Sequence, residues 1–129
     1  MTNTDKAIML SRAYMYAHAW NGLYFKLTQA VVIRIKNEKR FSADCFGLWE
    51  NITDDEGREY HRITLDFSRH FENDQELRNS VFHELVHAYQ HEVKEEVDHN
   101  ASFWEWEEMA QNERATIRFF GDNFEDFKK

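Results

Sequence analysis

Two histidines and a glutamate in residues 81–87 have the spacing of a zinc motif. His83, Glu84 and His87 form the pattern H-E-x-x-H. Residues i and i+4 of an α-helix lie on the same face, so both imidazoles can bind one ion. Glu84 lies next to that face, where its carboxylate can reach a water on the metal without being a ligand. Zinc hydrolases need this combination, because the ion lowers the pKa of its water to about 7 and a carboxylate takes the proton.

The motif is informative only if it lies on a helix. Residues 73–76 form a capping box, which predicts a helix over residues 74–92. At 100° per residue, the apolar side chains fill one arc and the histidines with Glu84 fill the other. The apolar arc consists of Leu77, Val81, Phe82, Leu85, Val86, Ala88 and Tyr89. The alternative is an ordinary amphipathic helix with a solvated His/Glu face.

A catalytic zinc site needs a third protein ligand besides the two histidines. His91 lies two helical turns beyond His83, about 12 Å along the axis, which is too far for one ion. His99 follows a loop that can turn back toward the motif. Glu107 is the rival, because a glutamate about 20 residues after the second histidine is the third ligand in thermolysin-like peptidases. The spacing leaves His99 and Glu107 both open.

Three segments predict a small β-sheet. Residues 30–36 are β-branched and residues 41–49 carry small side chains on one face, and we expect them to form a hairpin around a polar turn. Residues 51–59 predict an acidic loop. Residues 61–67 alternate apolar and polar side chains, as expected of a third strand. We expect the stretch 60–66 to be the sheet edge that pairs with an extended peptide substrate.

Two further helices complete the predicted domain. Apolar residues recur at helical spacing over residues 5–25. A second capping box at residues 102–105 predicts a C-terminal helix that ends near residue 119. Phe124 and Phe127 follow it, and we expect them to dock on the core.

Composition limits the class of protein. The 129 residues suffice for one domain, and 42% hydrophobic and 16% aromatic residues fit a globular core. No apolar run of membrane-spanning length and no signal-peptide pattern occur, which predicts a cytoplasmic protein. The lone Cys45 excludes an internal disulfide and a cysteine-based zinc ribbon.

The net charge of −8 argues against a broad nucleic-acid-binding surface. A local basic patch near the first predicted turn is the exception, and it leaves DNA as a possible partner. The patch consists of Arg34, Lys36, Lys39 and Arg40.

The segment from His83 through Ala88, followed by His99 to Phe103, resembles the SprT-like metallopeptidase family, whose pattern is HExxHA, a variable loop and HGxxF. The upstream order of a helix, a hairpin and an Ile-Thr-Leu strand is also similar, so the likeness covers about residues 15–110. The chain departs from the pattern at Asn100, where the family has glycine; asparagine tolerates a left-handed backbone. With one cysteine among its 129 residues, the chain is not expected to form the zinc ribbon that many members carry.

The resemblance implies one zinc ion held by His83, His87 and His99, with Glu84 as the general base. It implies an α+β, zincin-like fold over residues 1–129, with an N-terminal helix, a three-stranded antiparallel sheet, the motif helix and a C-terminal helix. The family includes the Spartan-type proteases that degrade DNA–protein crosslinks, so the implied activity is peptide-bond hydrolysis.

Two points stay open at the level of sequence. The first is the group that stabilises the oxyanion, for which Tyr89 and His61 are candidates. The second is catalysis itself, because a non-catalytic zinc-containing binding module, associated with nucleic acid or DNA-bound proteins, would carry the same motif.

Overall fold

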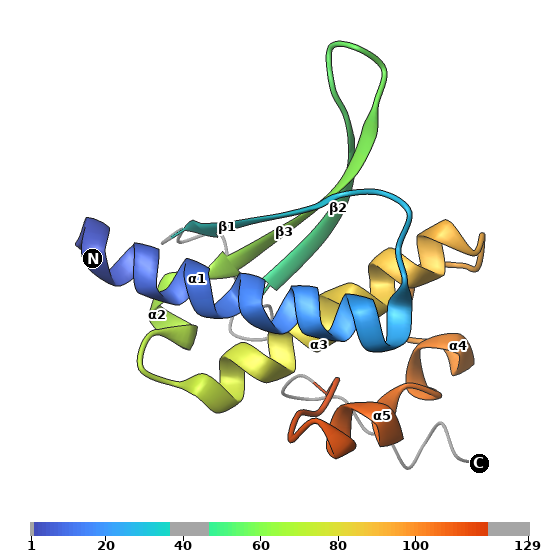
Figure 1. Ribbon diagram of the computed structural model, residues 1–129. Helices are drawn as coiled ribbons and strands as arrows, with labels where there is room; N and C mark the ends of the chain where they lie inside the picture. Colours follow the sequence, from blue (N-terminus) through green and yellow to red (C-terminus); the bar gives the residue numbers. More distant parts are fainter. Residues whose placement is uncertain (1, 37–46, 119–129) are drawn as a thin grey trace.

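The computed structural model describes residues 2–36 and 47–118 (Figure 1). It contains an α+β arrangement of one three-stranded sheet and several helices, as predicted. The elements are α1 (Asn3–Trp20), the π-helical turn η1 (Asn21–Phe25), β1 (Val31–Lys36), β2 (Gly47–Thr53), β3 (Glu59–Asp66), α2 (Phe67–His70), α3 (Asp74–Glu92), α4 (Ala101–Trp104) and α5 (Glu107–Asn112). Among these described residues, no helix combines the length and apolar character needed to cross a bilayer.

The sheet has the order β1-β3-β2 and is mixed. β3 runs parallel to β1, with Ile33 opposite Ile63, and antiparallel to β2, with Trp49 opposite Ile63. The predictions of an antiparallel sheet and of a hairpin between the first two strands were therefore wrong. Alternation along a strand specifies which face is buried, but it does not specify which neighbour the strand pairs with. A parallel pair such as β1 and β3 needs a crossover connection, and β2 lies within it.

The hairpin of this protein joins β2 to β3. Residues predicted as an acidic loop continue β2 as far as Thr53, and the chain turns only over residues 54–58. The Asp54 carboxylate accepts hydrogen bonds from the backbone N–H groups of Glu56 and Arg58, both at 2.9 Å. Gly57 has φ +81°, a left-handed conformation that favours glycine. Residues 41–46 of the predicted second strand lie outside the described residues.

β3 is the central strand of the sheet, so it cannot be the substrate-binding edge that the sequence predicted. Ile63, Thr64, Leu65 and Asp66 are all buried, as expected of a strand covered on both faces. Among the described strands, the edges of the sheet are β1 and β2.

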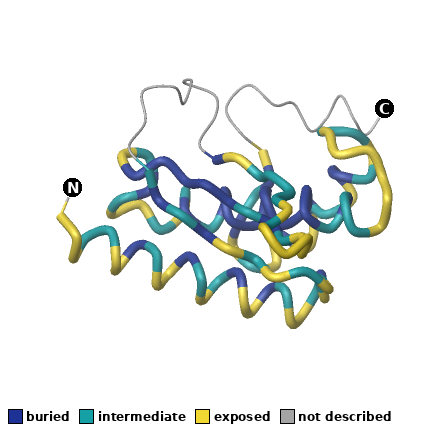
Figure 2. The backbone as a smooth tube through the Cα atoms, turned by 90° about the horizontal axis from the view of Figure 1, so that it is seen from above, coloured by how far each residue is buried: buried dark blue, intermediate teal, exposed yellow. Residues whose placement is uncertain are grey.

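α3 has the bounds that the capping box predicted, and the Asn73 side chain accepts from the backbone N–H of Glu76. It contacts α1, α2, α4, η1, β2 and β3, so it runs through the centre of the domain. α1 buries one side chain per turn on its inner face, and Figure 2 shows buried and exposed residues alternating along it. The rings of Trp20 and Phe25 meet Phe82 of α3 at 5.2 Å between centroids. This aromatic packing fixes α3 against the N-terminal helix.

The predicted C-terminal helix is wrong, because residues 101–112 form two short helices and the chain then extends. Asn100, not Ser102, caps α4 by accepting from the backbone N–H of Phe103. Asn100 itself is extended at φ −101°, so this position does not need a left-handed residue. Arg114 has φ +58° and turns the chain back along α3. Local helix propensity could not reveal this reversal, because side chains of α3 hold the returning segment.

Candidate metal centre

Three histidines converge on one point between α3 and the loop before α4. Nε2 of His83 lies 3.2 Å from Nε2 of His87 and 3.1 Å from Nε2 of His99. One ring nitrogen from each residue lies within 4.8 Å of the others, so the three side chains can hold one metal ion. Glu107 does not belong to this cluster. The structure thus brings together the three histidines that the family resemblance implied.

A backbone carbonyl orients His83. Nδ1 of this residue lies 2.5 Å from the carbonyl oxygen of Ile117. Because a carbonyl oxygen only accepts, Nδ1 carries the proton and Nε2 presents its lone pair to the other histidines. Burial, followed by the charges of His87 and His99, lowers the pKa of His83 well below its usual value. His83 is therefore a neutral imidazole, which is the form that binds metals.

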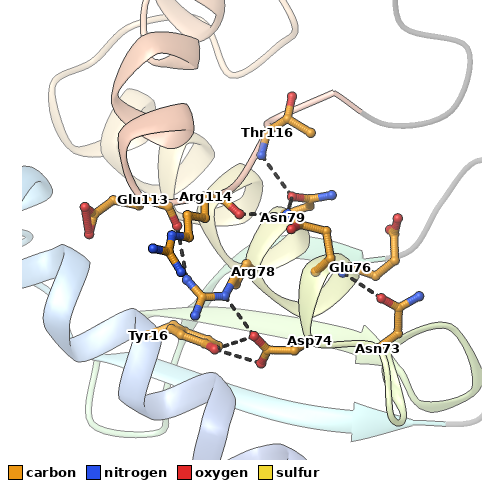
Figure 3. Close-up of polar contacts among 10 residues, drawn as sticks. Tyr16, Asn73, Asp74, Glu76, Arg78, Asn79, Glu113, Arg114 and Thr116 are labelled. Atoms are coloured by element: carbon orange, nitrogen blue, oxygen red, sulfur yellow. Dashed lines mark hydrogen bonds and ion pairs between the residues drawn. The ribbon is translucent and has the colours of Figure 1, made fainter.

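Hydrogen bonds hold the segment that supplies this carbonyl against α3. Residues 113–117, here called the strap, run beside the N-terminal half of that helix (Figure 3). Arg78 donates to the carbonyl of Glu113 at 3.2 Å, and Gln75 donates to the carbonyl of Arg114 at 2.7 Å. The backbone N–H of Thr116 donates to Asn79 Oδ1 at 2.9 Å. The same helix that carries His83 therefore also fixes the segment that orients His83.

Glu107, the rival third ligand, holds the end of the strap. Its carboxylate accepts from the backbone N–H of Ile117 at 3.0 Å and from the hydroxyl of Thr116 at 2.5 Å. Gln111 donates to it at 3.0 Å. The side chain is fully buried, and these three donors satisfy it. Glu107 thus holds the backbone N–H of Ile117, the residue whose carbonyl orients His83.

A side-chain amide orients His87. Its Nδ1 lies 2.8 Å from Oε1 of Gln90, and the other end of that amide, Nε2, lies 3.0 Å from the carbonyl oxygen of Asp98. Only the amide NH₂ can donate to a carbonyl, so Oε1 faces His87 and Nδ1 of His87 donates to it. Nε2 of His87 then presents a lone pair toward Nε2 of His83. Acceptor atoms that face one another at 3.2 Å suit a cation between them, so the residues present fit a metal ion.

Phe103 forms an apolar base under the three histidines. Its ring centroid lies 4.7 Å from that of His83, 5.0 Å from that of His87 and 4.7 Å from that of His99. Phe103 is fully buried, so it excludes water from one side of the cluster. An apolar surround of this kind strengthens the interaction of ligands with a cation.

Glu84 lies beside the cluster but outside the ligand set. Its Oε1 is 3.9 Å from Nε2 of His83, and only 3% of the residue is exposed. Oε2 is buried and has no hydrogen-bond partner among the described residues. Burial raises the pKa of Glu84 to about 8. A buried, unsatisfied carboxylate is costly, and it fits a site in which a cation and its water complete the environment.

The other candidates lie apart from the histidine cluster. His91 packs its ring against Trp49 at 5.3 Å, as expected from its distance along the helix. Tyr89 packs against Phe25 and Trp106. His61 accepts from Trp49 Nε1 at 3.0 Å and donates to Glu92 at 2.6 Å, so both ring nitrogens are in use.

The basic patch lies only partly in the described structure. Arg34 and Lys36 are on β1, and Arg34 Nε donates to the hydroxyl of Thr64 at 2.8 Å. Lys39 and Arg40 lie outside the described residues. Nucleic-acid binding by this patch stays a prediction.

Sequence reasoning missed Gln90 and the carbonyl of Ile117. Gln90 has a local signal, because a polar residue three positions after His87 on a helix can reach its ring. Ile117 has no such signal in the sequence, because its role depends on a backbone carbonyl that the strap places.

The fold and the site define a small α+β domain with a three-histidine candidate metal centre beside a buried glutamate. Residues 13–123 match the SprT-like family, and the chain belongs to that family. This match confirms the resemblance noted in the sequence, and it implies a zinc-metallopeptidase-like fold. No curated protein and no solved structure gives a significant match to the chain.

Proposed function

We propose that this protein is a zinc-dependent peptidase in which His83, His87 and His99 hold one Zn²⁺ and Glu84 is the general base. The observation that carries the proposal is the convergence of three imidazoles, two of them oriented through Nδ1, next to the buried carboxylate of Glu84. Membership of the SprT-like family supports it.

Zinc is the metal that this donor set favours. Three imidazole ligands would leave one position of a four-coordinate site open, which is the usual arrangement of catalytic zinc. A bound zinc ion supplies a Lewis acid that polarises a peptide carbonyl and lowers the pKa of a water molecule.

Glu84 is placed to move the protons of the reaction. It takes a proton from the attacking water and delivers it to the leaving amine. Its burial excludes bulk water and raises its affinity for that proton. A nearby dication would lower the pKa of Glu84 from its metal-free value of about 8, toward the range in which a carboxylate serves as a base at neutral pH.

β2 is the strand to which an extended peptide would add. It pairs with β3 on one side, and no described strand pairs with its other edge. Its first residue, Gly47, comes so close to Glu84 that a Cβ atom there would lie 3.5 Å from Glu84 Cγ. Backbone pairing with β2 would therefore carry a substrate past the proposed base.

Metal analysis tests the ligand set. We expect about one zinc per chain in the wild-type protein and little zinc in the double variant His83→Ala/His99→Ala. Stoichiometric zinc in the double variant would contradict the proposed ligands.

Cleavage of labelled casein, with and without single-stranded DNA, tests catalysis. We expect Glu84→Gln to keep its zinc and to lose at least 100-fold in rate, since general-base catalysis contributes about 10²–10⁴-fold. A zinc-loaded protein without Glu84-dependent cleavage under either condition would instead support the non-catalytic binding module. Charge reversal of Arg34 and Lys36 tests any effect of the DNA.

A further inference from the structure

We propose that Gln90 is a positioning residue that joins His87 to the loop carrying His99, so that one amide sets two of the three ligands. The role rests on the proposed zinc site. Gln90 lies in α3, one turn after His87, and is 1% exposed. A buried amide must be hydrogen-bonded at both ends, and each end of this one is bonded to a different part of the site.

The oxygen of the amide serves His87. Oε1 accepts from Nδ1 of His87 at 2.8 Å, which selects the tautomer with the Nε2 lone pair directed at the metal position. Histidine ligands commonly donate their other ring nitrogen to an oxygen, and this bond fixes ring orientation.

The nitrogen of the amide serves the loop. Nε2 lies 3.0 Å from the carbonyl oxygen of Asp98, 2.9 Å from the hydroxyl of Ser102 and 3.2 Å from Oδ1 of Asn100. The Ser102 hydroxyl donates to the same Oδ1 at 2.6 Å. These contacts hold the chain immediately before and after His99.

The loop that carries His99 depends on such hydrogen bonds more than α3 does. His83 and His87 are spaced by the helix itself, whereas His99 belongs to a segment without regular structure between α3 and α4. Ordering a loop residue costs conformational entropy, and a ligand that moves by about 1 Å weakens a metal site. Gln90 anchors this loop to the rigid helix through its hydrogen bonds.

The substitution Gln90→Glu tests the two ends of the amide separately. The variant keeps nearly the same shape and an oxygen for His87, but it replaces the donor that faces the loop with a second acceptor. Electrostatics alone predicts that an added negative charge tightens cation binding. The positioning role predicts weaker binding, by about 10-fold or more, the range found when groups that orient metal ligands are changed.

A double-mutant cycle with His99→Ala tests the mechanism, with zinc affinity measured by competition against a chromophoric chelator. We expect Gln90→Glu to weaken zinc binding about 10-fold or more in the wild-type background and to have little further effect in His99→Ala. Equal losses in both backgrounds, or no loss in the wild type, would overturn the proposal. Gln29→Glu is a matched charge control, because its remaining oxygen can still accept from Asn51.

Two further measurements distinguish positioning from general support of the fold. With Co²⁺ in place of zinc, we expect the visible absorption of a four-coordinate site in the wild type and a weaker spectrum in Gln90→Glu. In the metal-free protein, we expect faster hydrogen exchange over residues 98–102 in the variant. Unchanged exchange and an unchanged Co²⁺ spectrum would overturn the role of Gln90 even if the wild type cleaves peptides. A non-additive cycle without Glu84-dependent cleavage would instead contradict only the proposed peptidase function.

Discussion

The carbonyl oxygen of Ile117 accepts a hydrogen bond from Nδ1 of His83 at 2.5 Å, across 34 residues of chain. This contact makes a candidate metal ligand on α3 depend on the strap, which lies more than 30 residues later in the sequence but packs beside the same helix. The backbone N–H of the same residue donates to Glu107 at 3.0 Å, so the carboxylate and the imidazole both bind the backbone of one residue. The metal centre is therefore supported from a direction that the H-E-x-x-H motif does not indicate.

Glu107→Gln should keep the metal and lose stability. The substitution places an amide where the carboxylate accepts three hydrogen bonds, so at least one buried donor loses its partner. The free energy of unfolding should fall by about 1–3 kcal/mol in urea titrations. Zinc should still bind in near-stoichiometric amount, because Glu107 is not a ligand. If Glu107→Gln loses zinc while His99→Ala retains it, the thermolysin-like assignment is correct instead.

Gly47 should tolerate only small additions, because β2 passes close to Glu84. A Cβ atom there would lie 3.2 Å from Leu65 Cδ2 and 3.4 Å from the carbonyl oxygen of Thr64. Gly47→Val should destabilise the fold by about 1–3 kcal/mol, as overpacking does, and should slow casein cleavage by displacing Glu84. Gly22→Ala is the control: nothing lies within 4 Å of its added Cβ. A Gly47→Val protein as stable and as active as the Gly22→Ala protein would contradict the close packing of Gly47 against Leu65 and Glu84.

The stability of the metal-free protein should fall with acid, partly through His70. Nδ1 of His70 donates to the carbonyl of Asp66 at 2.6 Å, and Nε2 accepts from the Ser80 hydroxyl at 2.7 Å. Burial lowers the pKa of His70 below its usual value near 6.5, so below that pH the unfolded chain binds a proton that the folded protein does not. A difference of one bound proton changes the free energy of unfolding by at most about 1.4 kcal/mol per pH unit. In urea titrations from pH 7 to pH 5, His70→Gln should show a shallower loss of stability than the wild type; parallel curves would rule His70 out.

Zinc should stabilise the folded protein and chelation should reverse the effect. A ligand that binds only the folded state adds about 2.7 kcal/mol at 100 times its dissociation constant. Thermal unfolding of the chelated and zinc-loaded protein should show this difference as a rise in the melting temperature. The rise should be absent in His83→Ala, whereas Glu84→Gln, which leaves all three histidines in place, should keep it. An equal rise in His83→Ala would mean that zinc binds elsewhere.

The sequence by itself determined the elements whose signals are local. The capping box at Asn73 gave the start of α3 correctly, and i, i+4 spacing placed His83 and His87 on one face, because both depend on the geometry of a single helix. The β-branched run gave β1. His99 needed the family pattern, since spacing alone left Glu107 equally suitable.

Only the tertiary structure decided how distant segments meet. The parallel pairing of β1 with β3, the two short helices after Asn100 and the return of the strap along α3 all depend on contacts between residues far apart in sequence. Hydrophobic periodicity specifies which face of an element is buried, but not which element packs against it. A backbone carbonyl such as that of Ile117 is present in every residue type, so its role cannot be predicted from the sequence. The H-E-x-x-H motif therefore specified two candidate ligands, whereas the fold specified what holds them in place.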